Sequence, residues 1–328
     1  MLSGQQVMKE VEEFLAAWPV LWTLLETLCV LIPMAALLAF SGIGFVSTLA
    51  RILGQTRKRA SFDKCARQLA LFGFVLGWLL LIGSRVWLFL ARMDSEALYA
   101  WMTETCWFLL AGSVLVASLY YALWKHMSKY PATAAVLGIL SGLAACGALV
   151  ATLMTMRCHA LGLQVSLAGK SLPETVTLIL KIFVVPEAST SFWNALWYTP
   201  ALVAAFSAGS GALWLFACRR RDDFGRDHYN AMIAWCARLS RNAWGLLWAL
   251  LLVFSFFQLL LFPADGPGDT WPSIATEAAY LLYWAIPALL WTFVGRSAVA
   301  LRHGMTLLAA LFLAGTFLVP YYLEICAA

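Results

Sequence analysis

The chain has 328 residues, of which 62% are hydrophobic and only 12% are charged, and its formal net charge is +5. A soluble domain of ordinary composition has about a quarter charged residues, so this composition excludes one and indicates an integral membrane protein. The apolar runs are long enough for helical spans of about 20 residues, and the short alternating segments of a membrane β-barrel are not visible. We therefore predict an all-α bundle in a lipid bilayer.

The first residues, MLSGQQVMKEVEEF, are polar and acidic and do not resemble a cleaved signal peptide. Residues 5–17 are compatible with a short amphipathic helix. Pro33, Pro287 and Pro320 lie in the first, seventh and eighth of the spans that follow, and a kink is expected at each. Eight spans are predicted, at about residues 18–50, 68–91, 104–125, 132–156, 193–217, 232–262, 272–295 and 304–325.

Most of the 22 Lys and Arg residues lie in alternate connections, those after spans one, three, five and seven. The first of these connections reads RILGQTRKRASFDKCAR, and the third contains Arg219, Arg220 and Arg221. The opposite connections are acidic and have few basic residues. By the positive-inside rule the basic connections are cytoplasmic, so both termini are predicted on the outer side of a bacterial inner membrane.

A weak internal repeat divides the chain. AFSG at residues 39–42 resembles AFSA at 205–208, and CAR occurs at 65–67 and again at 236–238. Both pairs have the same orientation in the membrane, which predicts two parallel four-helix bundles.

The repeat predicts where the two transmembrane units begin and end. Residues 1–160 form the first transmembrane unit, 161–192 an outer connection, and 193–328 the second unit. Within the connection, residues 172–183 are either an amphipathic helix on the membrane surface or a plain loop.

Ionisable residues inside spans are costly and therefore suggest function. Glu26 lies in the first span, Arg85 in the outer half of the second, Glu104 at the start of the third and Glu277 at the outer start of the seventh. Together with aromatic residues such as Trp101 they could form a quinol-binding pocket in which Glu104 accepts a proton as electrons leave. The alternatives are structural: Arg85 can extend to the interface, and Glu104 can stabilise the first turn of its helix.

The sequence shows no metal-binding spacing among its eight cysteines, and a disulfide between Cys158 and Cys326 is an open alternative. The histidines lie at span ends or in connections, so no facing pair is predicted for haem. A haem held near the cytoplasmic face by two of His126, His228 and His303 is the remaining haem-binding alternative. No nucleotide-binding loop or Ser/His/Asp arrangement is present.

Three stretches resemble a known family: WPVLWTLL at residues 18–25, AWMTET at 100–105, and a segment from FWN at 192 to FSAG at 206–209. In this order they are similar to the membrane anchor subunits of dimethyl sulfoxide reductase and to polysulfide-reductase-type membrane subunits. The resemblance covers essentially the whole chain. The chain departs from the family pattern at three points. Glu104 lies one residue earlier than the family's glutamate, and no histidine lies at the outer end of the second span. In the eighth span, GTFLVP at residues 315–320 stands in place of the family's Gly-Glu-x-x-x-Arg.

The resemblance implies a haem-free anchor that oxidises non-covalently bound menaquinol. Its implied partners are a four-cluster iron–sulfur subunit and a molybdopterin catalytic subunit on the outer face. The family's functional glutamate corresponds most nearly to Glu104.

The predicted function is therefore that of a quinol-interacting subunit of a respiratory oxidoreductase, with the direction of electron flow and the electron acceptor left open. Because of the missing histidine, a purely structural anchor is the first alternative. A secondary transporter and a cytochrome bd-like haem subunit are the others.

Overall fold

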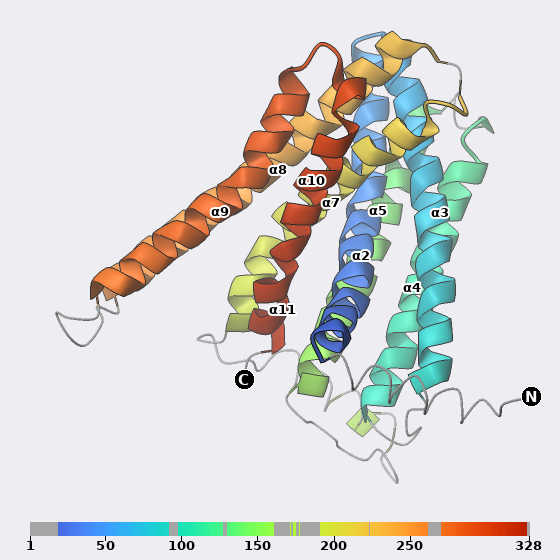
Figure 1. The fold of residues 1–328 in the computed structure, drawn as a ribbon. Helices are drawn as coiled ribbons and strands as arrows, with labels where there is room; N and C mark the ends of the chain where they lie inside the picture. The colour runs from blue at the N-terminus through green and yellow to red at the C-terminus, as the bar shows by residue number, and fades with distance from the viewer. Residues whose placement is uncertain are drawn as a thin grey trace, which may run out of the picture.

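A computed structural model describes residues 19–91, 98–126, 130–160, 191–222, 224–261 and 270–326, together with a few positions between 171 and 177 (Figure 1). Side chains next to the gaps, including those of residues 19–26, are not described. Within these ranges the secondary structure is entirely helical, without a strand. Eight helices among the described residues are long and apolar enough to cross a membrane, which confirms the predicted spans.

The helices alternate in direction along the chain (Figure 1). Each of the first seven predicted spans corresponds to one continuous helix, and the eighth is divided into two. In chain order the elements are α2 (Pro19–Thr56), α3 (Ala60–Ala91), α4 (Leu98–Ala122), α5 (Pro131–Ala160), α7 (Ser191–Cys218), α8 (Arg226–Leu261), α9 (Thr270–Arg296), η2 (Ala300–His303), α10 (Gly304–Thr316) and α11 (Leu318–Cys326).

The first basic connection is mostly helical, whereas the sequence predicted spans that end at residue 50 and resume at 68. α2 continues to Thr56, and α3 begins four residues later. The turn between them contains Lys58, which has the left-handed φ of 51°. An apolar run marks the part of a helix that lies in the membrane, but polar residues can continue the same helix into water, so the helices here are longer than the predicted spans.

The eighth span is broken near its proline. α10 ends at Thr316, where the Phe317 amide instead donates to the Ala314 carbonyl at 3.2 Å, and α11 begins at Leu318. Pro320 has no amide hydrogen to donate to the carbonyl four residues earlier, that of Thr316. By contrast, α2 and α9 continue through Pro33 and Pro287 without ending.

α2 and α7 form the centre of the molecule. About 56% and 67% of their spans are buried inside the protein, more than for any other described span. The two helices approach closely at Gly42, where an added Cβ would lie 2.5 Å from Ser207 Oγ and 2.7 Å from the Val203 carbonyl oxygen. Small residues permit such close helix contacts in membranes.

The two CAR segments also come together. α3 packs against α8, and the thiols of Cys65 and Cys236, both completely buried, lie within hydrogen-bonding reach of each other. Each of the two repeated motifs therefore lies where the first four spans meet the last four.

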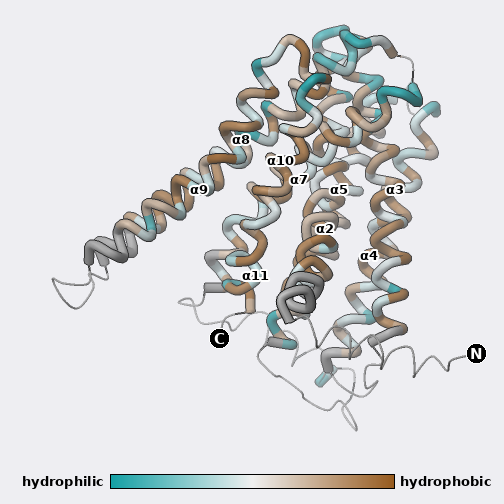
Figure 2. Tube along the Cα trace, viewed as in Figure 1, coloured by the Kyte–Doolittle hydropathy of each residue, from teal (hydrophilic) through white to brown (hydrophobic). Residues whose placement is uncertain are grey.

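The two ends of the bundle differ in polarity. Hydrophilic residues gather at the end formed by the α2–α3, α4–α5, α7–α8 and α9–η2 connections, which we call the basic end (Figure 2). α2 begins and α11 ends at the opposite end, which we call the terminal end (Figure 1).

The α8–α9 hairpin leans away from the other helices toward the terminal end (Figure 1). Indole groups hold its two helices together. Trp244 Nε1 donates to the Trp284 carbonyl at 2.7 Å, and Trp248 Nε1 donates to the Leu281 carbonyl at 2.8 Å.

Two segments for which the sequence leaves an amphipathic helix open lie wholly or mostly outside the described residues. These are residues 5–17 and most of 172–183; of the latter, Pro173, Glu174 and Thr177 are helical. The predicted connection at 161–192 likewise lies almost wholly outside them.

Candidate functional site

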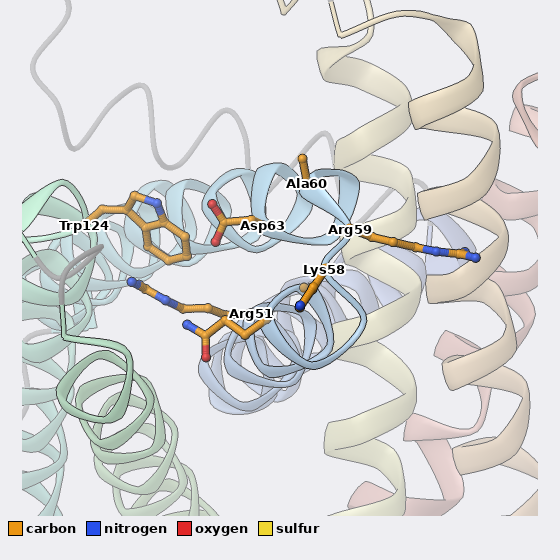
Figure 3. Close-up of a pocket in the computed structure, with 8 residues that line it drawn as sticks. Arg51, Lys58, Arg59, Ala60, Asp63 and Trp124 are labelled. Atoms are coloured by element: carbon orange, nitrogen blue, oxygen red, sulfur yellow. The ribbon is translucent and has the colours of Figure 1, made fainter.

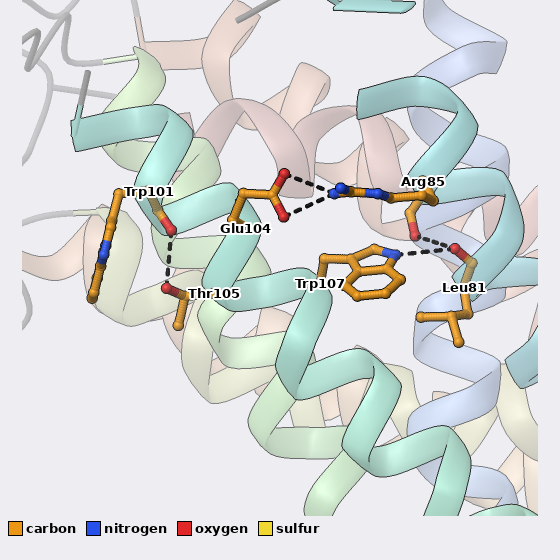
Figure 4. Close-up of polar contacts among 7 residues, drawn as sticks. Leu81, Arg85, Trp101, Glu104, Thr105 and Trp107 are labelled. Carbon is orange, nitrogen blue, oxygen red and sulfur yellow. Dashed lines mark hydrogen bonds and ion pairs between the residues drawn. The ribbon is translucent and has the colours of Figure 1, made fainter. Parts of the chain in front are cut away.

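The structure brings together two of the predicted site residues, Arg85 on α3 and Glu104 on α4 (Figure 4). Arg85 Nη1 donates to both carboxylate oxygens of Glu104, at 2.7 Å and 2.8 Å. Each residue lies six positions from the terminal end of its helix, which is about 9 Å along the helix axis. Because α3 and α4 are antiparallel neighbours, equal depth places the two side chains side by side.

A tryptophan forms one wall of this ion pair. Trp107, one turn along α4 from Glu104, has its ring centroid 5.0 Å from Arg85 Cζ. Its indole Nε1 donates to the Leu81 carbonyl at 3.2 Å, which fixes the ring against α3 (Figure 4). A cation beside an aromatic face is attracted by the ring quadrupole, so Trp107 helps to hold Arg85 in place.

The ion pair is open to its surroundings. The side chains of Arg85 and Glu104 are 53% and 46% exposed. A ligand at the terminal end can therefore reach the carboxylate without displacing a helix. The arrangement can bind a polar headgroup, and a carboxylate released from the arginine can accept a proton.

The other predicted site residues do not join the pair. Trp101 lies near it on α4, but its ring points away from Arg85 (Figure 4). Glu277 is on α9, far from α3 and α4 (Figure 1), where it accepts a 3.4 Å hydrogen bond from Ser255 of α8. Glu26 is in α2, and its side chain lies outside the described residues.

Glu277 was grouped with Arg85 and Glu104 because all three were predicted at similar depth. Depth alone does not fix the side of the bundle on which a residue lies. The leaning α8–α9 hairpin carries Glu277 away, so among the predicted residues with described side chains only Arg85 and Glu104 contact each other, with Trp107 beside them.

Sequence reasoning missed a polar cluster at the terminal end, between α5, α7 and α11. Arg157 is only 6% exposed, and its Cζ lies 4.9 Å from the centroid of the Phe192 ring. Nearby, the hydroxyls of Thr199 and Tyr321 share a 2.6 Å hydrogen bond, and Glu324 is half-buried on the same helix as Tyr321. The signal that could have found this cluster was Glu324, a carboxylate within the apolar run of the last span.

A pocket of about 240 Å³ at the basic end was also missed (Figure 3). It lies where α2, α3 and the end of α4 meet, and Arg51 and Trp124 line it with Asp63 of α3. Arg51 is only 3% exposed, and its Cζ lies 4.4 Å from the centroid of the Trp124 ring. The sequence assigned Arg51 to a cytoplasmic connection, but the continuation of α2 keeps it inside the bundle.

A third cluster of polar side chains joins α3 to the α7–α8 connection. The buried Gln68 side chain donates to Asp222 at 2.9 Å and to the Tyr229 hydroxyl at 3.1 Å. Its carbonyl oxygen lies 3.2 Å from His228 Nε2. Because Gln68 is on α3 and its partners are in the α7–α8 connection and on α8, this network links the first four spans to the last four.

Among the described residues, the cysteines and the potential metal ligands give no further site. All eight cysteines are free thiols, so the disulfide considered between Cys158 and Cys326 is not formed in this structure. The described part of the chain contains no group of three or more His, Cys, Asp or Glu residues that could hold a metal ion.

No family model, no curated protein and no solved structure matches this chain.

Proposed function

We propose that the chain is a haem-free membrane anchor and quinol-interacting subunit of a respiratory oxidoreductase in the bacterial inner membrane. Electrons would pass between menaquinol and an iron–sulfur subunit on the outer side, which in turn serves a molybdopterin catalytic subunit. The observation that carries the proposal is the Arg85–Glu104 ion pair, set within apolar spans at the terminal end and walled by Trp107. Charged residues inside spans are costly and call for a functional explanation.

The chemistry assigns a separate role to each side chain. Oxidation of a quinol to a quinone releases two electrons and two protons; the electrons leave to the partner subunit, and the protons need an acceptor. Glu104 accepts one proton once its carboxylate is freed from the guanidinium, and the other proton is released to water on the outer side. Arg85 orients that carboxylate, and Trp107 provides an aromatic surface for the quinol ring.

The orientation assigned to the bundle supports this scheme. The positive-inside rule would put the basic end in the cytoplasm, so the termini and the ion pair lie on the outer side. In two parallel four-helix units, equivalent helices meet at the centre. The contact of Gly42 with Ser207 and that of Cys65 with Cys236 are consistent with this arrangement.

Replacing Glu104 with Gln in the assembled complex tests the proposal. The amide keeps the size of the side chain but cannot accept a proton at neutral pH, so we expect quinol oxidation to fall by about 10²-fold or more. Glu277→Gln is the matched control, because it changes the same group on the other side of the bundle. Undiminished oxidation by Glu104→Gln, with normal assembly, would rule out the role of Glu104.

A second function, that of a purely structural anchor, is favoured by one observation. Both oxygens of Glu104 are occupied by Arg85 of the neighbouring helix, so the ion pair can serve simply to join α3 to α4. This alternative predicts that the purified complex retains no quinone and does not quench the fluorescence of a quinol analogue. Specific quenching that is lost in Trp107→Ala would instead support the quinol site.

A further inference from the structure

A groove of about 430 Å³ runs along α9 at the basic end. Its part inside the membrane span is apolar, and its part at the end of the span is polar and basic. Leu289 and Phe293, which are 65% and 58% exposed, form the apolar part. The residues that line the groove are Leu289, Thr292, Phe293, Arg296, Ser297 and His303.

The basic part of the groove is preorganised. His303 Nε2 lies 3.0 Å from Ser297 Oγ, and the His303 ring packs edge-on against Phe293 with 4.7 Å between ring centroids. Arg296, by contrast, has no hydrogen bond or ion pair from its side chain to any described residue. None of the residues that line the groove is acidic, so the guanidinium is available to an anion.

The position of the groove matches the membrane boundary. The seventh span ends at Arg296, and Leu289 lies seven residues, or about 10 Å, deeper along the same helix. An anion at Arg296 would therefore be joined to apolar contacts that extend into the hydrocarbon region. A phospholipid combines these features, since its phosphodiester lies at the boundary and its acyl chains lie below it.

We propose that this groove binds an anionic phospholipid of the leaflet at the basic end. The phosphodiester is bound by Arg296 beside His303, and an acyl chain lies on Phe293 and Leu289. Basic pockets at the surface of transmembrane helices attract anionic headgroups in this way. The site depends on the chain spanning a membrane, and it is independent of the quinol chemistry proposed above.

Native mass spectrometry of the full chain, purified with any subunit that accompanies it, tests this assignment. The probes are dioleoylphosphatidylglycerol and dioleoylphosphatidylcholine, which share acyl chains and differ in headgroup charge. We expect the anionic lipid to bind at least fivefold more tightly. Arg296→Gln should lower that affinity about fivefold, as expected for the loss of one basic contact. It should weaken phosphatidylcholine binding less, because the choline cation offsets the charge of the phosphodiester in that lipid.

Two controls make the test specific. Arg302→Gln removes an exposed basic residue at the same end of the molecule that does not line the groove, so it should not change lipid binding. Glycerol 3-phosphate, a headgroup without acyl chains, should not displace the lipid. Equal affinity for the two lipids, an equal effect of Arg302→Gln, or displacement by glycerol 3-phosphate would each overturn the proposal.

Discussion

At Gly44 the backbone of α2 approaches that of α5, and replacing Gly44 with alanine tests the central packing of the bundle. An added Cβ would lie 2.8 Å from the Gly138 carbonyl oxygen and 2.9 Å from the Gly142 amide nitrogen. Both neighbours are backbone atoms, so no side-chain rotation can relieve the overlap. The two helices must separate by roughly half an ångström or more to restore contacts of about 3.5 Å.

We expect Gly44→Ala to destabilise the protein by about 1–3 kcal/mol, the usual cost of overpacking a close-packed interior. Gly147→Ala is the matched control on α5, since an added Cβ there meets nothing within 4 Å. The control should be neutral or stabilising by up to about 1 kcal/mol, because alanine favours a helix over glycine.

Thermal unfolding in detergent, followed with a dye that reacts with newly exposed thiols, measures both variants. The buried Cys65 and Cys236 make the dye sensitive to unfolding of the core. Gly44→Ala should lower the Tm by about 2–6 °C, and Gly147→Ala should not lower it. Equal Tm values for the two variants would refute the close approach of α2 and α5.

Three further changes probe other contacts. Treating the folded protein with the small oxidant diamide should form a disulfide between Cys65 and Cys236, which mass spectrometry of the linked peptides detects. A disulfide between Cys65 and another cysteine would instead contradict the α3–α8 contact. Gln68→Met should destabilise the protein by about 1–3 kcal/mol, because it removes the hydrogen bonds from the amide to Asp222 and Tyr229 and its contact with the buried His228 ring. An unchanged denaturation midpoint would argue against the network. Tyr321→Phe removes one buried hydroxyl, but its partner Thr199 keeps a second hydrogen bond within its own helix. The free energy of unfolding should therefore fall by only about 1 kcal/mol. A fall as large as that caused by Gln68→Met would contradict this expectation.

The spans could be predicted from the sequence because apolar runs of the required length are a direct consequence of the bilayer. The ends of the helices could not. Arg51 followed an apolar run and was assigned to a connection, yet α2 continues for five more residues and buries it. Polar residues end a span without ending a helix.

The candidate site was predictable in part for a similar reason. Depth in the membrane can be counted along the chain, and similar depth placed Arg85 and Glu104 in one predicted pocket. The side of the bundle on which a helix lies depends on packing, which composition does not encode, so the sequence could not show that α9 holds Glu277 apart from Arg85 and Glu104. Arg157 was counted only as an outer charge, because its burial results from contacts with helices distant in sequence.

The central claim is that Glu104 accepts a proton from quinol, and rescue by a shorter carboxylate tests it most directly. The measurement is the initial rate of oxidation of a menaquinol analogue per assembled complex, for Glu104→Asp and Glu104→Gln side by side. The proposal predicts that the aspartate variant retains a substantial part of the activity and that the glutamine variant loses it. Equal rates for both variants, at normal assembly, would contradict the claim.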